Sequence, residues 1–341
     1  QPLTVTAEDD QEYDGHKDFQ INVSADNVLK SSPAVTSLTS AFDGMPQPTW
    51  VTSDGTNLYV SDYSLNVILK VVIATGEISI FAGSTEMSGS EDGTGTAATF
   101  NKPKGITNDG TNLYVADSYN HVIRKIVIET AEVTTIAGVA EDSGSSDSFD
   151  FQTGPTTPKF YRPVGITIVG SGLYVSDTGN HVIRRVSTSS GFVETIAGTA
   201  GVKTFSDGEG QSAAFSGPTG LTSIGSDIYV ADTGNQVIRK IDTSSRVVTT
   251  IAGYKYTYGS DDGEGTSASF GTPRGITNDG MNLYVAEAGN NMIRKLMVSS
   301  GSSWEVSTIA GSETSSSDDG DGTSAGFQHP VGITYYQSNL Y

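Results

Sequence analysis

The chain repeats itself, and this repeat restricts its fold more than any other feature. A strand-like tripeptide, Leu-Tyr-Val or Ile-Tyr-Val, returns about every 55 residues, and a partial copy ends the 341-residue sequence at Leu340-Tyr341. A second signature, Phe-Ala-Gly or Ile-Ala-Gly, follows in five copies and ends at Gly83, Gly138, Gly198, Gly253 and Gly311. A fixed period in this range is typical of propellers, solenoids and arrays, in which each copy stacks on its neighbours.

One copy predicts four strands. In the second copy, two apolar runs flank Asn108-Asp109-Gly110, whose residues tolerate the positive φ of a tight hairpin. A polar turn over 117–120 precedes a third strand over 121–128, and a fourth follows over 133–138. Because the strands carry apolar residues on both faces, each sheet is expected to lie between two others. Radial stacking of four-stranded antiparallel meanders is a β-propeller.

The repeats resemble those of the NHL family. Four copies contain an acidic, Gly-rich string, which begins at Asp92-Gly93, Asp207-Gly208, Asp262-Gly263 and Asp319-Gly320. The string is followed, in this order, by Phe, Pro-x-Gly-Ile/Leu-Thr, Leu-Tyr-Val-Ala-Asp, Asn and Ile-Arg-Lys, or by close variants of these motifs. The resemblance covers roughly residues 46–341 and implies a propeller, commonly of six blades. It implies little about function, since the family includes binding modules, sensor ectodomains, RNA binders and a few metal-dependent lyases and hydrolases. The first copy departs from the pattern at Trp50 and Leu69, and the loop over 141–161 lacks the acidic string.

We therefore expect an all-β fold, a six-bladed propeller over 46–341 whose last blade is shared between the two ends of the chain. The sixth copy stops within its second strand, and an open ring would leave strand edges unpaired. Residues 19–24 and 34–39 alternate like the missing third and fourth strands. The N-terminal segment, 1–45, is predicted to supply these outer strands. The alternative is a separate arm, with a chain that continues beyond Tyr341.

Charge and composition exclude several classes of partner and of site. The formal net charge of −20 argues against nucleic acid, because affinity for phosphate backbones comes from cationic side chains. The sequence contains no run of 18 apolar residues, which is about the length needed to span a bilayer. The absence of cysteine excludes disulfides and thiolate metal sites. The Ser, Thr and Gly content favours an extracellular, cell-surface or periplasmic mature form, with a cytosolic protein as the alternative.

Recurring charged residues are interpreted as structural. An acidic residue before the third strand is followed seven positions later by arginine in four copies, as at Asp117 and Arg124. A catalytic residue should break the repeat rather than obey it, so each pair is expected to tie two strands of its own blade. His121 and His181 share one repeat position and are interpreted as turn residues rather than zinc ligands.

The acidic loops are the candidates for a cation site. Carboxylates in Gly-rich loops can coordinate Ca²⁺ through oxygen, and the candidate ligands are Asp92, Asp207, Asp262, Asp319 and Asp321. Their spacing does not match an EF-hand loop, and solvated turns have the same composition. No other cofactor is expected. We expect these loops to give one face of the propeller a negative potential.

Residues that break the repeat are the candidates for ligand binding. The position after the opening proline of each copy differs, and Lys104, Thr219 and Arg274 occupy it in three copies. Lys104 and Arg274 would bring positive charge to an acidic funnel. Aromatic side chains stand on loops at Tyr161, Tyr256 and Tyr258, where they could anchor a partner or pack on the loop itself.

These patterns leave three classes of function. We favour a non-catalytic extracytoplasmic module that binds a protein or small ligand through its acidic loop face. A metal-dependent lyase or hydrolase would need converging acid, Asn or His side chains in the channel, and the sequence indicates none. A sensor ectodomain separated from its anchor is the third class. We expect binding rather than turnover.

Overall fold

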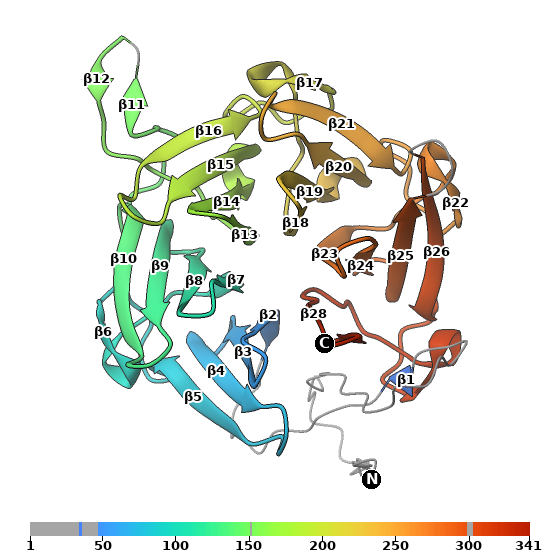
Figure 1. Cartoon of the computed structure of the whole chain (residues 1–341), viewed down its shortest axis with the longest axis horizontal. Coiled ribbons are helices and arrows are strands. Elements are labelled where there is room, and N and C mark those ends of the chain that lie inside the picture. Colours follow the sequence, from blue (N-terminus) through green and yellow to red (C-terminus); the bar gives the residue numbers. More distant parts are fainter. Residues whose placement is uncertain (1–33, 36–46, 151, 299–302) are drawn as a thin grey trace.

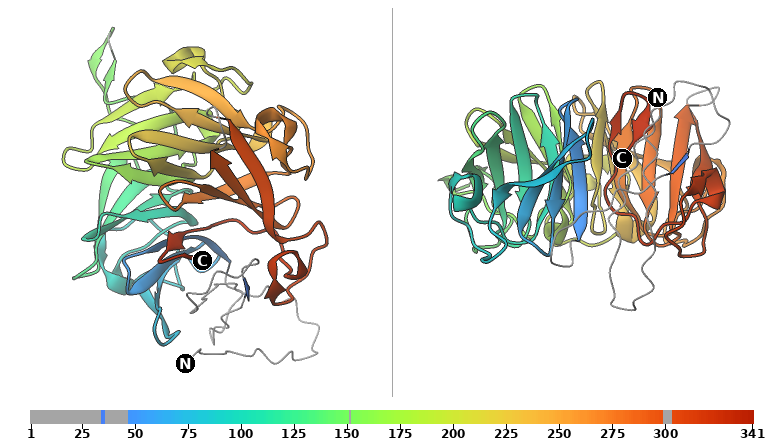
Figure 2. Two further views of the ribbon diagram at one scale, coloured as in Figure 1. Left: turned by 45° about the vertical axis from the view of Figure 1, so that its right-hand side comes forward. Right: turned by 90° about the horizontal axis from the view of Figure 1, so that it is seen from below.

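The computed structural model describes residues 34–35, 47–150, 152–298 and 303–341. Five antiparallel sheets stand around a central axis, and the first strand of each lies innermost (Figure 1). Seen from the edge, the sheets stand side by side and their connections lie at two faces (Figure 2). The all-β propeller is confirmed.

Each blade contains the predicted four-stranded meander. Blade 1 consists of β2 (Pro48–Ser53), β3 (Asn57–Asp62), β4 (Val67–Val72) and β5 (Ile78–Gly83). Blade 2 consists of β7 (Pro103–Asn108), β8 (Asn112–Asp117), β9 (Val122–Val127) and β10 (Glu132–Gly138). Blade 3 consists of β13 (Ile166–Val169), β14 (Gly172–Asp177), β15 (Val182–Ser187) and β16 (Val193–Ala197).

The last two complete blades follow the same order. Blade 4 consists of β18 (Leu221–Ile224), β19 (Asp227–Asp232), β20 (Val237–Ile241) and β21 (Val247–Ala252). Blade 5 consists of β23 (Pro273–Asn278), β24 (Leu283–Glu287), β25 (Met292–Val298) and β26 (Trp304–Gly311). In the long loop before blade 3, β11 (Phe149–Asp150) pairs with β12 (Gly154–Pro155).

The prediction of four strands is incomplete for three blades. A two-residue strand from the preceding loop adds to the outer edge of blades 2, 4 and 5; these are β6 (Gly93–Thr94), β17 (Gly208–Glu209) and β22 (Gly263–Glu264). The Asp-Gly-x-Gly strings therefore run along the outer edge of the ring. Single 3-10 turns continue these strands or follow second strands: η1 (Gly95–Ala97), η2 (Thr178–Asn180), η3 (Gly210–Ser212), η4 (Thr233–Asn235), η5 (Gly265–Ser267) and η6 (Gly322–Ser324).

The hydrophobic core is divided among the junctions between neighbouring blades. Between blades 1 and 2, Tyr59 and Ile68 pack with Phe100 and Leu113. The other junctions repeat this arrangement around Phe160, Phe215, Phe270 and Phe327. Burial of both faces of each sheet explains why the second strands carry three consecutive apolar or aromatic residues, such as Leu58-Tyr59-Val60. No helix in the described ranges is long and apolar enough to cross a membrane.

The partial sixth copy lies between blades 5 and 1. β28 (Tyr335–Tyr336) and β29 (Asn339–Leu340) form a two-stranded sheet. A Cβ added to Gly275 would lie 2.2 Å from the carbonyl oxygen of Val331, and one added to Gly332 would lie 2.5 Å from that of Thr49. The innermost layer of the ring thus continues from blade 5 to blade 1 through the sixth copy.

The predicted count of six blades is wrong, because the described residues form five complete blades. The physical reason is that, within the described residues, the sixth copy forms a sheet of two short strands, β28 and β29, with which no third or fourth strand pairs. Of the segments predicted to supply them, 19–24 and 36–39 lie outside the described residues. β1 (Ala34–Val35) pairs with β27 (Gly320–Asp321) in a separate two-stranded sheet.

The register of β1 is the same as that of a fourth strand. Ala34 lies opposite Asp321 and Val35 opposite Gly320. In blade 2, Glu132 lies opposite Thr94 and Val133 opposite Gly93, and blades 4 and 5 repeat this pairing. β1 therefore takes, relative to β27, the position that the start of the fourth strand takes relative to β6, β17 and β22.

Candidate functional site

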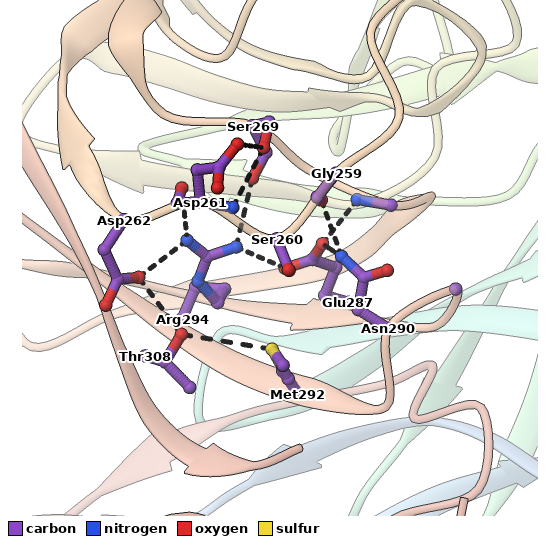
Figure 3. A network of polar contacts seen from close by, with 12 residues as sticks. Gly259, Ser260, Asp261, Asp262, Ser269, Glu287, Asn290, Met292, Arg294 and Thr308 are labelled. Carbon is purple, nitrogen blue, oxygen red and sulfur yellow. Dashed lines mark hydrogen bonds and ion pairs between the residues drawn. The ribbon is translucent and has the colours of Figure 1, made fainter. Parts of the chain in front are cut away.

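The recurring acid-arginine pairs are buried structural networks. Arg294 Nη1 lies 2.8 Å from Glu287 Oε2, and Arg294 Nη2 lies 2.8 Å from Asp262 Oδ1 (Figure 3). The guanidinium also donates to the backbone carbonyls of Ser269 and Asp261. Arg124, Arg184 and Arg239 make the equivalent contacts, and all four arginines are fully buried. Because a buried cation needs such compensation, the predicted structural role is confirmed.

Burial shifts the titration of the inner carboxylates. It raises the pKa of Asp117 to about 6, although the positive charge of Arg124 opposes this. The same balance raises the pKa of Asp177 and of Asp232 to about 6. These carboxylates are ionised at pH 7, and each of the three pairs is an ion pair at that pH.

Three predicted calcium ligands have partners within the protein. Asp92, Asp207 and Asp262 each accept a hydrogen bond from the arginine of their blade and another from a threonine hydroxyl of its fourth strand. The other two candidates, Asp319 and Asp321, lie just before and within β27. Over the described ranges, no three His, Asp or Glu side chains converge closely enough to hold a metal ion. Calcium binding stays an untested prediction.

The long loop before blade 3 supplies the same contact without the acidic string. Asp147 Oδ1 lies 2.7 Å from Arg184 Nη2 and accepts a hydrogen bond from Thr195 Oγ1. Sequence comparison between copies missed Asp147 because an insertion shifts its position. The requirement for a second carboxylate beside each buried arginine could have pointed to it.

The two repeat-position histidines connect neighbouring blades. His121 Nδ1 accepts a hydrogen bond from the backbone N–H of Arg162, and His181 Nδ1 accepts one from Gly217, both at 3.0 Å. Asn66 and Asn291 accept the equivalent bonds in their own copies. The prediction that these histidines are turn residues is confirmed. Burial lowers the pKa of both.

The residues after the opening prolines lie in the innermost strands of blades 1, 2 and 5 and shortly before the first strand in the other copies. We call them the inner rim: Thr49, Lys104, Val164, Thr219, Arg274 and Val331. Their backbones join successive blades, because Gly105 N–H donates to Val164 and Gly220 N–H donates to Arg274. Thr219 is buried, and its hydroxyl donates to the Arg274 carbonyl at 3.0 Å. The structure therefore places Thr219 in a contact between blades.

Lys104 and Arg274 lie on opposite sides of the axis, on β7 and β23 (Figure 1). Both are partly buried, and neither side chain forms an ion pair within the described residues. Arg274 Nε is fully buried without a hydrogen-bond partner there. Burial lowers the pKa of Arg274. Burial also lowers the pKa of Lys104, opposed by Tyr119 and assisted by the positive charges of Arg274, Arg162 and Lys102.

Two further cations adjoin the inner rim through tyrosines. Lys102 Nζ lies 4.9 Å from the ring centroid of Tyr63 and 4.6 Å from that of Tyr119. Arg162 lies over Tyr119 at 4.8 Å, and Lys104 Nζ lies 5.6 Å from the centroid of Tyr63. The tyrosine hydroxyls are 3.3 Å apart. Cations over aromatic faces are attracted by the ring quadrupole, so these contacts gather positive charge at one place.

Burial and the neighbouring groups act on Tyr63 in opposite directions. Burial raises its pKa, whereas the hydrogen bond with Tyr119 and the charges of Lys102 and Arg162 lower it. The net effect is a pKa below the ordinary value of tyrosine. The positive charges of Lys102 and Arg162 therefore contribute to the lowered pKa of Tyr63.

The three predicted tyrosines lie in different surroundings. Tyr161 adjoins the cations Lys102, Lys104 and Arg162, since Arg162 lies over its ring at 5.7 Å and His121 packs against it. Tyr256 and Tyr258 are exposed on the loop after β21, where Tyr256 contacts Phe205 and Tyr258 donates to the Gly289 carbonyl. Of the predicted binding residues, Lys104 and Tyr161 therefore adjoin Lys102, Arg162 and their tyrosines, whereas Arg274 lies on the facing strand β23.

The sequence prediction missed Lys102, Arg162, Tyr63 and Tyr119. Their signal is again a departure from the repeat. Tyr119 stands where three other copies have Gly179, Gly234 and Gly289, and the residue before the opening proline is cationic in two copies alone. Each departure was visible, but their meeting depends on the ring.

Comparison with known proteins supports the sequence resemblance. No model of a known protein family matches the chain. The chain is 28% identical over 333 residues to Protein SUPPRESSOR OF QUENCHING 1, chloroplastic, of Arabidopsis thaliana, covering 90% of this chain and 30% of that protein. It is 27% identical over 277 residues to NHL repeat-containing protein 2 of Gallus gallus, covering 73% of this chain and 38% of that protein. The chain is similar in sequence to NHL repeat-containing proteins.

The chain spans less than half the length of either relative. Among solved structures, an auxiliary nutrient binding protein from Bacteroides thetaiotaomicron superimposes with a TM-score of 0.61 at 16% identity, covering 85% of this chain and 64% of that one. At this level of identity the likeness shows a common propeller fold alone.

Proposed function

We propose that this NHL-repeat propeller is a non-catalytic binding and assembly module whose contact surface is its loop face. The loop face carries the turns between second and third strands and the residues that flank the opening prolines. The observation that carries the proposal is the gathering there of Lys102, Lys104, Arg162 and Arg274 without a carboxylate partner among the described residues. In a chain of net charge −20, unpaired cations at one place favour a role in recognition.

The remaining charged groups support binding rather than turnover. The buried arginines are each held between two carboxylates, so they are not available to a substrate. The histidines at the repeat position are occupied by backbone N–H groups. The relatives and the solved propeller named above include a nutrient binding protein, which is in keeping with a ligand-binding role.

The acidic outer edge forms a second part of the proposal. Asp92, Asp207 and Asp262 expose about half of their side chains there, beside the two-residue strands. A basic partner protein would meet this edge, whereas an anionic ligand would meet the inner rim. We further propose an extracellular, cell-surface or periplasmic location, which the acidic composition rich in Ser, Thr and Gly supports.

A ligand panel tests the proposed function. Thermal unfolding of the intact chain would be followed with small anions, acidic peptides, oligolysine and neutral sugars. We expect at least one probe to raise the unfolding temperature, since a ligand that binds the native state stabilises it. The double variant Lys102→Gln, Arg162→Gln should weaken an anionic response, and mass spectrometry should recover the probe unchanged.

A matched variant on the opposite face serves as control. Arg246 is exposed in the turn between the third and fourth strands of blade 4. The variant Arg246→Gln should leave each response intact. Conversion of a probe to product, or equal loss of binding in the control, would contradict a binding role of the loop face.

A further inference from the structure

Arg274 differs from the four buried arginines of the blades. Each of those has two carboxylates, and each stacks on a phenylalanine, as Arg294 does on Phe270 at 5.3 Å. Arg274 has neither an ion pair nor a ring contact within the described ranges; its side chain is partly buried, and its Nε lacks a hydrogen-bond partner there, as do the Nε atoms of the other four arginines. Burying a guanidinium without compensation is unfavourable. The inner rim therefore holds an incomplete charge balance.

Lys104 shares this condition from the opposite side of the axis. Its side chain is partly buried, and its Nζ lies 5.6 Å from the ring centroid of Tyr63. The positive charges of Arg274, Arg162 and Lys102 act on it together. Cation-π contacts explain the positions of Lys102 and Arg162, but they leave the net positive charge in place. Within the described residues, these cations therefore lack a compensating negative charge.

The donors define the chemistry of a compensating group. A guanidinium offers a planar fork of N–H groups, and an ammonium offers three donors around a point charge; both suit oxygen atoms of carboxylate or phosphate. Tyr63 and Tyr119 add hydroxyls at the edge. A polyanion is disfavoured because the chain carries a net charge of −20. The cluster thus fits a small ligand.

We infer that the inner rim binds a small oxyanion with at least two negative charges, held between Lys104 and Arg274 and flanked by Lys102 and Arg162. This inference rests on the proposed binding function and names its ligand class. Free phosphate and a di- or tricarboxylate share the required chemistry. Separate titrations with inorganic phosphate and with citrate distinguish these two ligands.

The test uses the intact chain in a buffer without phosphate or sulfate. Inorganic phosphate, citrate and, as a monovalent control, acetate are titrated by calorimetry and by thermal unfolding. Phosphate or citrate should raise the unfolding temperature of the wild type, and acetate should not. Lys104→Gln and Arg274→Gln should weaken binding about tenfold or more, as expected for loss of a charge-assisted hydrogen bond. Lys104→Arg should retain binding.

A second measurement separates a ligand site from a structural role. Without anion, Lys104→Gln and Arg274→Gln should unfold at the same or a higher temperature than the wild type, because they remove uncompensated charge. A lower unfolding temperature in the absence of anion would overturn the inference. So would the lack of any response to phosphate and citrate, or an equal loss in Arg246→Gln. If another panel ligand still binds the loop face, the proposed function survives that failure.

Discussion

Arg184 donates through Nη1 to Oδ2 of Asp177 at 2.9 Å, and neither side chain has surface open to solvent. The outer carboxylate of the same arginine, Asp147, is partly exposed. The two contacts therefore differ in the dielectric around them, although their lengths are similar.

Asp177→Asn is expected to destabilise the protein by about 3–5 kcal/mol, since it leaves the charge of Arg184 uncompensated in the interior. Asp147→Asn should have a smaller effect, about 1 kcal/mol, because water reaches that side of the pair. Urea unfolding of both variants measures the difference. Equal losses would contradict the inequality of the two carboxylates.

Asp62 is predicted to tolerate the same change. Leu69 stands where the other copies have arginine, and Asp62 Oδ2 is buried without a hydrogen-bond partner in the described residues. Burial raises the pKa of Asp62, so the stability associated with its protonated form is lost as pH rises through the folded-state pKa. Asp62→Asn keeps the acceptor for Ser64 and Leu65 and should be neutral or stabilising at pH 7, with less benefit at pH 4. A loss as large as that of Asp177→Asn would refute this.

The histidine contacts predict a dependence of stability on pH. Because the folded-state pKa of His121 and His181 is lowered, their contribution is present above the ordinary value, about 6.5, and is lost as pH falls through the folded value. Protonation of Nδ1 removes the acceptor for Arg162 N–H and Gly217 N–H. The double variant His121→Asn, His181→Asn should lose less stability between pH 7 and pH 5 than the wild type.

Two other copies supply the control for this substitution. Asn66 and Asn291 already accept the equivalent bonds, at 2.8 and 2.9 Å. Asparagine therefore fits the left-handed backbone at this position and does not titrate. Unfolding temperatures measured across the pH range would count against the idea if wild type and variant gave parallel curves.

Close approach of neighbouring blades makes Gly165 sensitive to substitution. A Cβ added there would lie 1.9 Å from the carbonyl oxygen of Thr219, which belongs to the next blade. Gly165→Ala should destabilise the protein by about 1–3 kcal/mol or more, as overpacking forces backbone shifts. Gly144→Ala is the control, because its Cβ would meet the flexible side chain of Lys159. Similar unfolding midpoints for the two variants would show that the junction can relax.

The pairing of β1 with β27 predicts a role in closing the ring. Ala34 and Val35 have, relative to β27, the register that a fourth strand has in blades 2, 4 and 5. Val35→Pro removes a backbone donor and is disfavoured within a sheet. It should lower the unfolding temperature and promote association through the exposed edge, as measured by light scattering. Asp9→Pro, outside both predicted segments, should have no effect.

The sequence predicted the blades because strand signals recur with constant spacing and lie between apolar neighbours. It predicted the pairs such as Asp117 and Arg124 for the same reason. It did not predict the partner of Arg184, since an insertion moves Asp147 out of alignment. It placed Lys104 and Arg274 at one funnel, but it did not predict that Lys102 and Arg162 would meet at Tyr119, because residues from different repeats come together only after the ring has formed.

The placement of the arginines also determines the electrostatic field that acts on an approaching anion. Four cations are hidden inside blades, so a distant anion meets a repulsive field set by the net charge of −20. Within a few ångströms of the axis, the unpaired cations reverse the sign of that field. Added salt screens the distant repulsion more than the local attraction, because the Debye length falls to about 10 Å at 0.1 M. The rate of anion capture should therefore rise as salt is first added, and only then decline.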